Sequence, residues 1–181
     1  MPRPHRDVAA GIFHVYTHCV WASRSLFRDD VDRLDFLRRL AQTTVHVGWK
    51  CLAYCLMGTH YHLLVDVADG VLPVGMQRLN YAYARDFNQR HELRGHVQFA
   101  RYGSRRILGE DALLGCFEYV ANNPVEAGLC PSACDWPWSS YASTVGLAPP
   151  PSFVDPRPVL SCFGGPLELA VAGLRSFVEG W

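Results

Sequence analysis

The chain has 181 residues, of which 49% are hydrophobic, and its formal net charge is zero. This length suits one domain with a sizeable core, and the apolar share excludes a disordered chain. No apolar run approaches the ~20 residues of a membrane span, and no secretory apolar segment follows the polar, basic residues 1–8, so we expect a cytoplasmic protein that does not insert into a membrane.

The first half of the chain predicts a strand, a helix and a hairpin. Residues 11–22 alternate as a strand, with His14, Tyr16 and His18 on one face. Asp29 or Asp30 can cap a helix that extends to about residue 47. The expected apolar stripe of this helix consists of Leu34, Leu37, Leu40, Ala41, Thr44 and Val45. Residues 50–57 and 60–67 are expected to pair as two strands around a turn at residues 58–59.

The second half predicts two more helices around a fourth strand, and then an extension. A helix over residues 73–88 would bury a stripe formed by Met76, Leu79, Tyr83 and Phe87. A strand is expected within residues 97–108, and a third helix from Asp111 to about residue 123, where Pro124 would end it. A proline-rich connector over residues 149–158 and a last helix over residues 166–178 follow.

This order of elements predicts an α+β protein with a ferredoxin-like antiparallel sheet and helices packed on one face. We divide the chain into a domain at residues 1–148 and a C-terminal extension at residues 149–181.

The seven cysteines are expected to be reduced thiols, because their number is odd and no export signal accompanies them. Cys51 and Cys55 are predicted to share one face of a strand as small apolar residues. Cys130 and Cys134 could hold zinc only with two further ligands, and no second pair of Cys or His residues supplies them.

A His-x-His pattern occurs in the second strand of the predicted hairpin. Since alternate residues of a strand point to the same face, His60 and His62 can reach one cation while Tyr61 points into the core. The apolar flanks of the pattern support a strand. Two exposed histidines without a metal are the alternative interpretation.

The third predicted helix carries a tyrosine away from its core stripe. At about 100° per residue, Tyr119 and Asn123 share a face one turn apart, and Gly115 leaves open space one turn before Tyr119. A tyrosine hydroxyl, with a pKa of about 10, needs help to act as a nucleophile. A cation on His60 and His62, with Asn123 as a third ligand, would fit phosphoryl transfer. An ordinary surface tyrosine is the alternative.

Arginine dominates the basic residues, since Lys50 is the only lysine. Arginine suits contacts to phosphates and base edges, and we predict a groove for single-stranded DNA in which Tyr81 or Tyr102 can stack on a base. Its predicted arginines are Arg78, Arg85, Arg101, Arg105 and Arg106. A GC-rich genome that favours arginine codons is the alternative explanation, and zero net charge argues weakly against nucleic acid.

Three segments in the same order resemble the single-tyrosine HUH transposases. Residues 54–65 (YCLMGTHYHLLV) resemble the His-hydrophobic-His segment of that family, residues 118–129 (EYVANNPVEAGL) its nucleophile helix, and residues 135–141 (DWPWSSY) the segment after it. The resemblance extends from about residue 11 to residue 141 and points to the branch of REP-associated tyrosine transposases. This chain departs from the family at residues 58–59, where Pro-Asn is frequent, and at Tyr61, where an aliphatic residue is usual.

The resemblance implies an HUH fold with Tyr119 as the nucleophile and one Mg²⁺ or Mn²⁺ held by His60, His62 and Asn123. It implies cleavage of single-stranded DNA, at hairpin-forming REP-type repeats, through a 5′-phosphotyrosine that leaves a free 3′-hydroxyl. Rejoining reverses this step, so no nucleotide cofactor is needed. A monomer and a homodimer are both compatible with the sequence.

Two other enzyme classes lack their motifs here. HIT-type nucleotide hydrolases need a third histidine at the position of Leu64, and two-histidine phosphoesterases need two His-x-Thr/Ser motifs, which the sequence does not contain. The alternative from a different class is a non-catalytic DNA-binding module that keeps the transposase scaffold.

Overall fold

A computed structural model of the chain describes residues 9–19, 25–93 and 101–180. Four strands form one antiparallel sheet in the order β2-β3-β1-β4. They are β1 (Gly11–His18), β2 (Lys50–Leu56), β3 (His60–Val67) and β4 (Gly103–Arg106). The crossover helices α1 (Asp30–Val47) and α2 (Val71–Arg90) complete the predicted ferredoxin-like α+β arrangement, which is confirmed.

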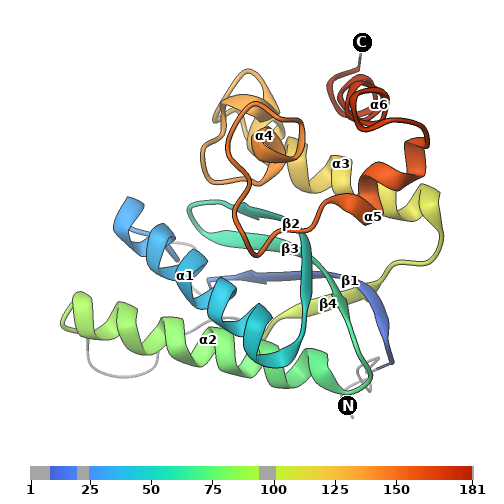
Figure 1. Cartoon of the computed structure of the whole chain (residues 1–181). Coiled ribbons are helices and arrows are strands. Elements are labelled where there is room, and N and C mark those ends of the chain that lie inside the picture. The colour runs from blue at the N-terminus through green and yellow to red at the C-terminus, as the bar shows by residue number, and fades with distance from the viewer. Residues whose placement is uncertain (1–8, 20–24, 94–100, 181) are drawn as a thin grey trace, which may run out of the picture.

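Helices cover both faces of this sheet (Figure 1). The two crossover helices pack on one face, where Phe36, Leu40, Leu79 and Tyr83 join the first core cluster. The predicted stripe of α2 is buried there, as expected. Helix α3 (Glu110–Glu126) lies on the opposite face. The expectation that helices pack on one face therefore holds for α1 and α2, whereas α3 packs on the opposite face.

The regular elements of the C-terminal extension pack on the same side as α3. Its regular elements are α5 (Arg157–Leu160), the 3-10 turn η2 (Ser161–Phe163) and α6 (Leu167–Glu179), preceded along the chain by η1 (Ala133–Asp135) and α4 (Tyr141–Thr144). Val159, Leu174 and Val178 are buried in the second core cluster together with Phe117 of α3. The extension therefore adds to the core that holds α3 in place. Among the described residues, no helix is long and apolar enough to cross a membrane.

A β-bulge in β2 sends its two cysteines to opposite faces of the sheet. The pairing with β3 shifts register between Cys51 and Ala53, so that one extra residue breaks the alternation. Cys51 therefore lies in the core cluster of α1 and α2, whereas Cys55 lies in the cluster of α3. The prediction that Cys51 and Cys55 share a face was wrong for this reason.

Helix α1 buries a stripe that matches the predicted one only in part, at Leu40 and Thr44. Its buried residues are Asp32, Phe36, Leu40, Thr43 and Thr44. Leu34 and Val45, which the apolar pattern placed in the core, are 58% and 84% exposed. The sequence did reveal the start of the helix, because Asp29 caps it by accepting a hydrogen bond from the amide of Asp32.

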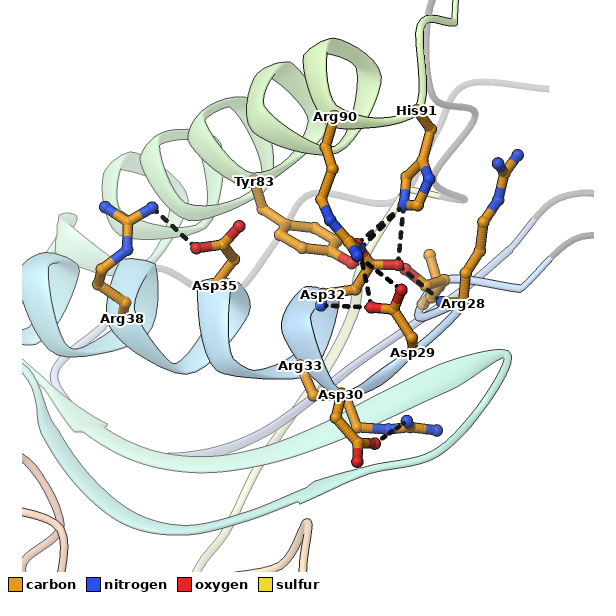
Figure 2. A network of polar contacts seen from close by, with 11 residues as sticks. Arg28, Asp29, Asp30, Asp32, Arg33, Asp35, Arg38, Tyr83, Arg90 and His91 are labelled. Atoms are coloured by element: carbon orange, nitrogen blue, oxygen red, sulfur yellow. Dashed lines mark hydrogen bonds and ion pairs between the residues drawn. The ribbon is translucent and has the colours of Figure 1, made fainter.

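The buried carboxylate of Asp32 explains this rotation of α1. Arg90 and His91, at the end of α2, both contact it, and the backbone amide of Arg28 donates to it (Figure 2). Arg90 also donates to Asp29, at 2.6 Å. The network fastens the start of α1 to the end of α2, so a charged residue occupies the face that an apolar pattern reserves for hydrophobic residues.

Helix α3 continues past Pro124 rather than ending before it. The helix extends to Glu126, and its closing bonds run from the amides of Ala127 and Leu129 to the carbonyls of Asn123 and Pro124. Pro124 has no N–H to donate to the carbonyl four residues earlier, so the helix gives up one hydrogen bond there and still completes its last turn. As a result, Asn123 is a helical residue with a fixed direction.

Candidate active site

The register between β1 and β3 gathers histidines on the sheet face that α3 covers. His18 lies opposite His60, and Tyr16 lies opposite His62. Residues that face each other across antiparallel strands point to the same side, so the His-x-His pair of β3 meets the alternating face of β1. Tyr61 points to the other face and is fully buried, as predicted.

His62 is the more enclosed of the two predicted histidine ligands, with 5% of its surface exposed. Its Nδ1 lies 2.9 Å from Nε2 of His14, and its Nε2 is buried with no hydrogen-bond partner among the described residues. Burial, together with the nearby His14, lowers the pKa of His62 to about 3. The imidazole is therefore neutral at neutral pH and keeps a lone pair for a ligand.

Helix α3 brings Tyr119 and Asn123 over this pair. Oδ1 of Asn123 lies 3.0 Å from Nε2 of His60, and the Tyr119 ring centroid lies 5.3 Å from that of His62. Tyr119 is 43% exposed, so its hydroxyl can meet a substrate from solvent. The predicted face of α3 is thus the one turned toward the two histidines.

A cavity of about 460 Å³ opens between α3 and the sheet. Its lining residues are His14, Tyr16, His62, Arg105, Gly115, Cys116 and Tyr119. A Cβ atom at Gly115 would meet nothing within 4 Å, which agrees with the predicted open space beside Tyr119. The Tyr119 side chain, the Arg105 guanidinium and the His62 imidazole therefore line one volume.

The side chains at this site fit a divalent ion through a mixed donor set. Nε2 of His60 and Oδ1 of Asn123 converge, and the orphaned Nε2 of His62 supplies a third donor without an internal partner. Within the described ranges, no three His, Cys, Asp or Glu side chains are arranged to hold a metal, so the candidate set depends on the Asn123 amide. Water or phosphate oxygens would complete the coordination of Mg²⁺ or Mn²⁺.

The predicted DNA-binding residues separate into two surfaces. Arg78, Tyr81 and Arg85 line a groove of about 560 Å³ between α1 and α2, on the helix layer that covers the other face of the sheet. Of the five predicted arginines, Arg105 alone lines the cavity that holds Tyr119. The five therefore do not share one groove.

Three predicted DNA contacts take other positions. Tyr102 is 9% exposed and belongs to the first core cluster, so its ring cannot stack on a base. Arg106 donates to the carbonyl of Ala10, at 2.8 Å. Arg101 is exposed outside the regular elements and does not line either hollow.

Sequence reasoning gave no role to His14 or Cys116, which both line the cavity. His14 is buried, and burial together with nearby Arg105 lowers its pKa to about 4. The alternation of His14, Tyr16 and His18 along β1 was the available signal. This alternation could not assign His14 to the site until the pairing of β1 with β3 was known.

Comparisons with known proteins agree with one another on a transposase family. The sequence profile of the family described as "Transposase IS200 like" matches residues 11–123. A curated relative from Haemophilus influenzae, named "Putative REP-associated tyrosine transposase", is 25% identical over 154 residues, which cover 78% of this chain and 86% of the relative. A solved structure of a REP-associated tyrosine transposase bound to a REP hairpin is similar in fold, with a TM-score of 0.69 and 16% identity, over 82% of this chain and 89% of that chain.

Proposed function

This chain belongs to the IS200-like transposase family, and we propose that it cleaves and rejoins single-stranded DNA with Tyr119 as the nucleophile. The observation that carries the proposal is the position of Tyr119 above His62 at the mouth of a cavity also lined by Arg105. A nucleophile, a cation and a metal-binding imidazole around one volume are what phosphoryl transfer requires.

In the proposed reaction, the Tyr119 oxygen attacks a backbone phosphorus of the DNA. An O–P bond forms to Tyr119, the bond from phosphorus to the 3′-oxygen breaks, and the phenol proton ends on the leaving oxygen or in solvent. The products are a 5′-phosphotyrosine and a free 3′-hydroxyl. Attack of a 3′-hydroxyl on the phosphotyrosine rejoins the strand, so the energy of the bond is conserved and no nucleotide cofactor enters.

We propose that His60, His62 and Asn123 hold one Mg²⁺ or Mn²⁺. Such an ion, when bound, polarises a phosphate oxygen and offsets charge that develops in the transition state. The chain's own residues then have separate tasks. Arg105 faces the same cavity and is suited to bind a phosphate oxygen, while Tyr119, half-exposed, presents its hydroxyl to the strand.

We propose hairpin-forming DNA as the substrate, by analogy with the REP hairpin bound to the transposase of similar fold. The groove between α1 and α2 is suited to a second DNA contact, because Arg78 and Arg85 offer phosphate contacts and Tyr81 is 70% exposed. We also propose that the protein acts on such DNA in the cytoplasm. Alanine at Arg78 and Arg85 should weaken hairpin binding and reduce its salt dependence, whereas alanine at Arg105 should chiefly reduce cleavage.

A covalent trapping assay tests the proposed chemistry. Labelled single-stranded hairpin DNA and Mn²⁺ should yield a protein–DNA adduct on a denaturing gel. Tyr119→Phe should bind the DNA and form no adduct. The matched variant Tyr81→Phe keeps the aromatic ring proposed to stack on a base and should form the adduct normally. EDTA and His60→Ala should each abolish the adduct. A trapped nucleotide mapped to another tyrosine would refute the assignment of Tyr119.

The same assay separates the enzyme from a non-catalytic DNA-binding module. Hairpin binding by the wild-type protein without any adduct, in Mg²⁺ or Mn²⁺, would favour the module.

A further inference from the structure

His14 makes the closest polar contact to His62 in the site. Its Nε2 lies 2.9 Å from Nδ1 of His62, and the two rings stack with centroids 5.1 Å apart and planes at 25°. The contact joins β1 to β3, which lie side by side in the middle of the sheet (Figure 1). Both imidazoles are buried, so the pair is held by packing as well as by the hydrogen bond.

The two nitrogens at this distance must share one proton. If Nδ1 of His62 carries it and donates to His14, then Nε2 of His62 is a bare lone pair. If Nε2 of His14 carries it, the proton of a neutral His62 is left on its own Nε2. Nε2 of His62 has no partner among the described residues in either arrangement, so hydrogen bonds within the protein leave both open. Only the first arrangement turns a lone pair of Nε2 toward the site, which is what a metal ligand requires.

We infer that His14 is a positioning residue for His62: it accepts the Nδ1 proton of His62, so that Nε2 of His62 faces the site as a lone pair. Metal-binding histidines generally donate their other ring N–H to such a partner, which fixes both tautomer and ring direction. The inference rests on the proposed role of His62 as a metal ligand.

His14 is not itself suited to bind the same ion through Nε2, since that atom is occupied by the hydrogen bond to His62. His18 makes a useful comparison. It also lies on this face of β1, opposite His60, but it is exposed and stacks with Tyr16 at 6.1 Å rather than bonding to His62. Replacing His14 and replacing His18 should therefore affect metal binding differently, although both residues lie on the same face of β1.

Two substitutions at position 14 separate the hydrogen bond from the bulk of the ring. His14→Gln can offer its side-chain oxygen near the former Nε2 and keep an acceptor for His62. His14→Phe fills the space but removes the acceptor. Mn²⁺ affinity, measured by calorimetry on the full chain without DNA, should fall about 10- to 100-fold in His14→Phe. It should stay within about threefold in His14→Gln, and in the control His18→Phe, if the acceptor is what matters.

Nitrogen-15 NMR of the metal-free wild-type protein supplies a readout that needs no metal. The expected tautomer of His62 carries its proton on Nδ1, and His14→Phe should populate the other tautomer. A wild-type His62 protonated at Nε2 would overturn the inference, even if the Phe variant failed to fold. Equal Mn²⁺ loss in the Gln and Phe variants, or unchanged affinity in both, would overturn it as well.

Failure of the proposed function gives a different result. If the wild-type protein binds no Mn²⁺, the metal role of His62 fails, whereas the NMR tautomer still decides whether His14 directs the ring. If the wild-type protein binds Mn²⁺ and forms the DNA adduct while His14→Phe matches it in affinity and tautomer, the positioning role alone is refuted.

Discussion

Replacing Gly103 with alanine should force Tyr16 out of its present position in the candidate site. Gly103 of β4 lies directly opposite Tyr16 of β1. A Cβ built at position 103 would lie 2.3 Å from Cζ of Tyr16 and 2.6 Å from its hydroxyl oxygen. Ordinary contact begins near 3.4 Å, so the ring must move by about 1 Å. The backbone at Gly103 is not in the left-handed region, and the three atoms nearest to such a Cβ all belong to the Tyr16 side chain.

The change in the free energy of unfolding depends on how freely the Tyr16 ring can move away from the new methyl group. Overpacking costs roughly 1–3 kcal/mol in a closed core, and we expect about 1 kcal/mol here because Tyr16 is 36% exposed and can swing outward. Alanine also restricts the unfolded chain, which stabilises the fold by roughly 0.4–1 kcal/mol. When Gly103→Ala is made in the wild-type protein, the cost of overpacking and the stabilisation from a more restricted unfolded chain nearly cancel. In a Tyr16→Ala background only the stabilising effect remains.

A double-mutant cycle measures this coupling. Urea unfolding of the wild-type protein, Gly103→Ala, Tyr16→Ala and the double variant should give an interaction energy of about 1 kcal/mol between the two positions. Independent sites add to within roughly 0.3–0.5 kcal/mol. A coupling inside that range would show that the Tyr16 ring does not rest on Gly103, and the arrangement of the cavity wall would then be wrong.

Three further substitutions test the packing of the helix layer. Asp32→Ala should lower the free energy of unfolding by about 2 kcal/mol, less than for a fully buried pair because Arg90 is partly exposed and keeps Asp29; a loss under roughly 0.5 kcal/mol in urea titrations would contradict the network. The bond from Arg90 lowers the pKa of Asp29 from 3.8 to about 2, so its stabilisation is present above 3.8 and is lost as pH falls toward 2. Asp29→Asn retains the helix cap but has no carboxylate to protonate, so it should lose less stability than the wild-type protein over that pH interval. Equal losses would count against the ion pair. Gly75→Ala places a Cβ 2.1 Å from Cζ2 of Trp49, which is 5% exposed, so we expect a loss of about 2–3 kcal/mol and a Tm lower by roughly 5–10 °C; an unchanged Tm would rule out this close approach.

The sequence by itself determined the features that depend on local periodicity. Alternation along β3 put His60 and His62 on one face and Tyr61 on the other, and helical spacing put Tyr119 and Asn123 on a face away from the core. The start of α1, with Asp29 or Asp30 as its cap, and the buried stripe of α2 also follow from residues within one or two turns. These features could be predicted because period and capping are fixed by backbone geometry, whatever the element later packs against.

Contacts between distant segments were decided only by the tertiary structure. The hydrogen bond between His14 and His62 spans 48 positions and depends on the register of β1 with β3. Arg78 and Arg105, which the sequence placed in one groove, lie on opposite sides of the sheet. Arg78 belongs to the crossover helix α2, and Arg105 belongs to the edge strand β4 and lines the cavity beneath α3.

Two smaller departures have the same origin. One extra residue in β2 turned Cys55 away from Cys51, and a carboxylate satisfied from α2 allowed Asp32 to occupy a core face of α1. In each case the deciding partner lies far along the chain, so the outcome depends on packing and pairing that no local pattern contains.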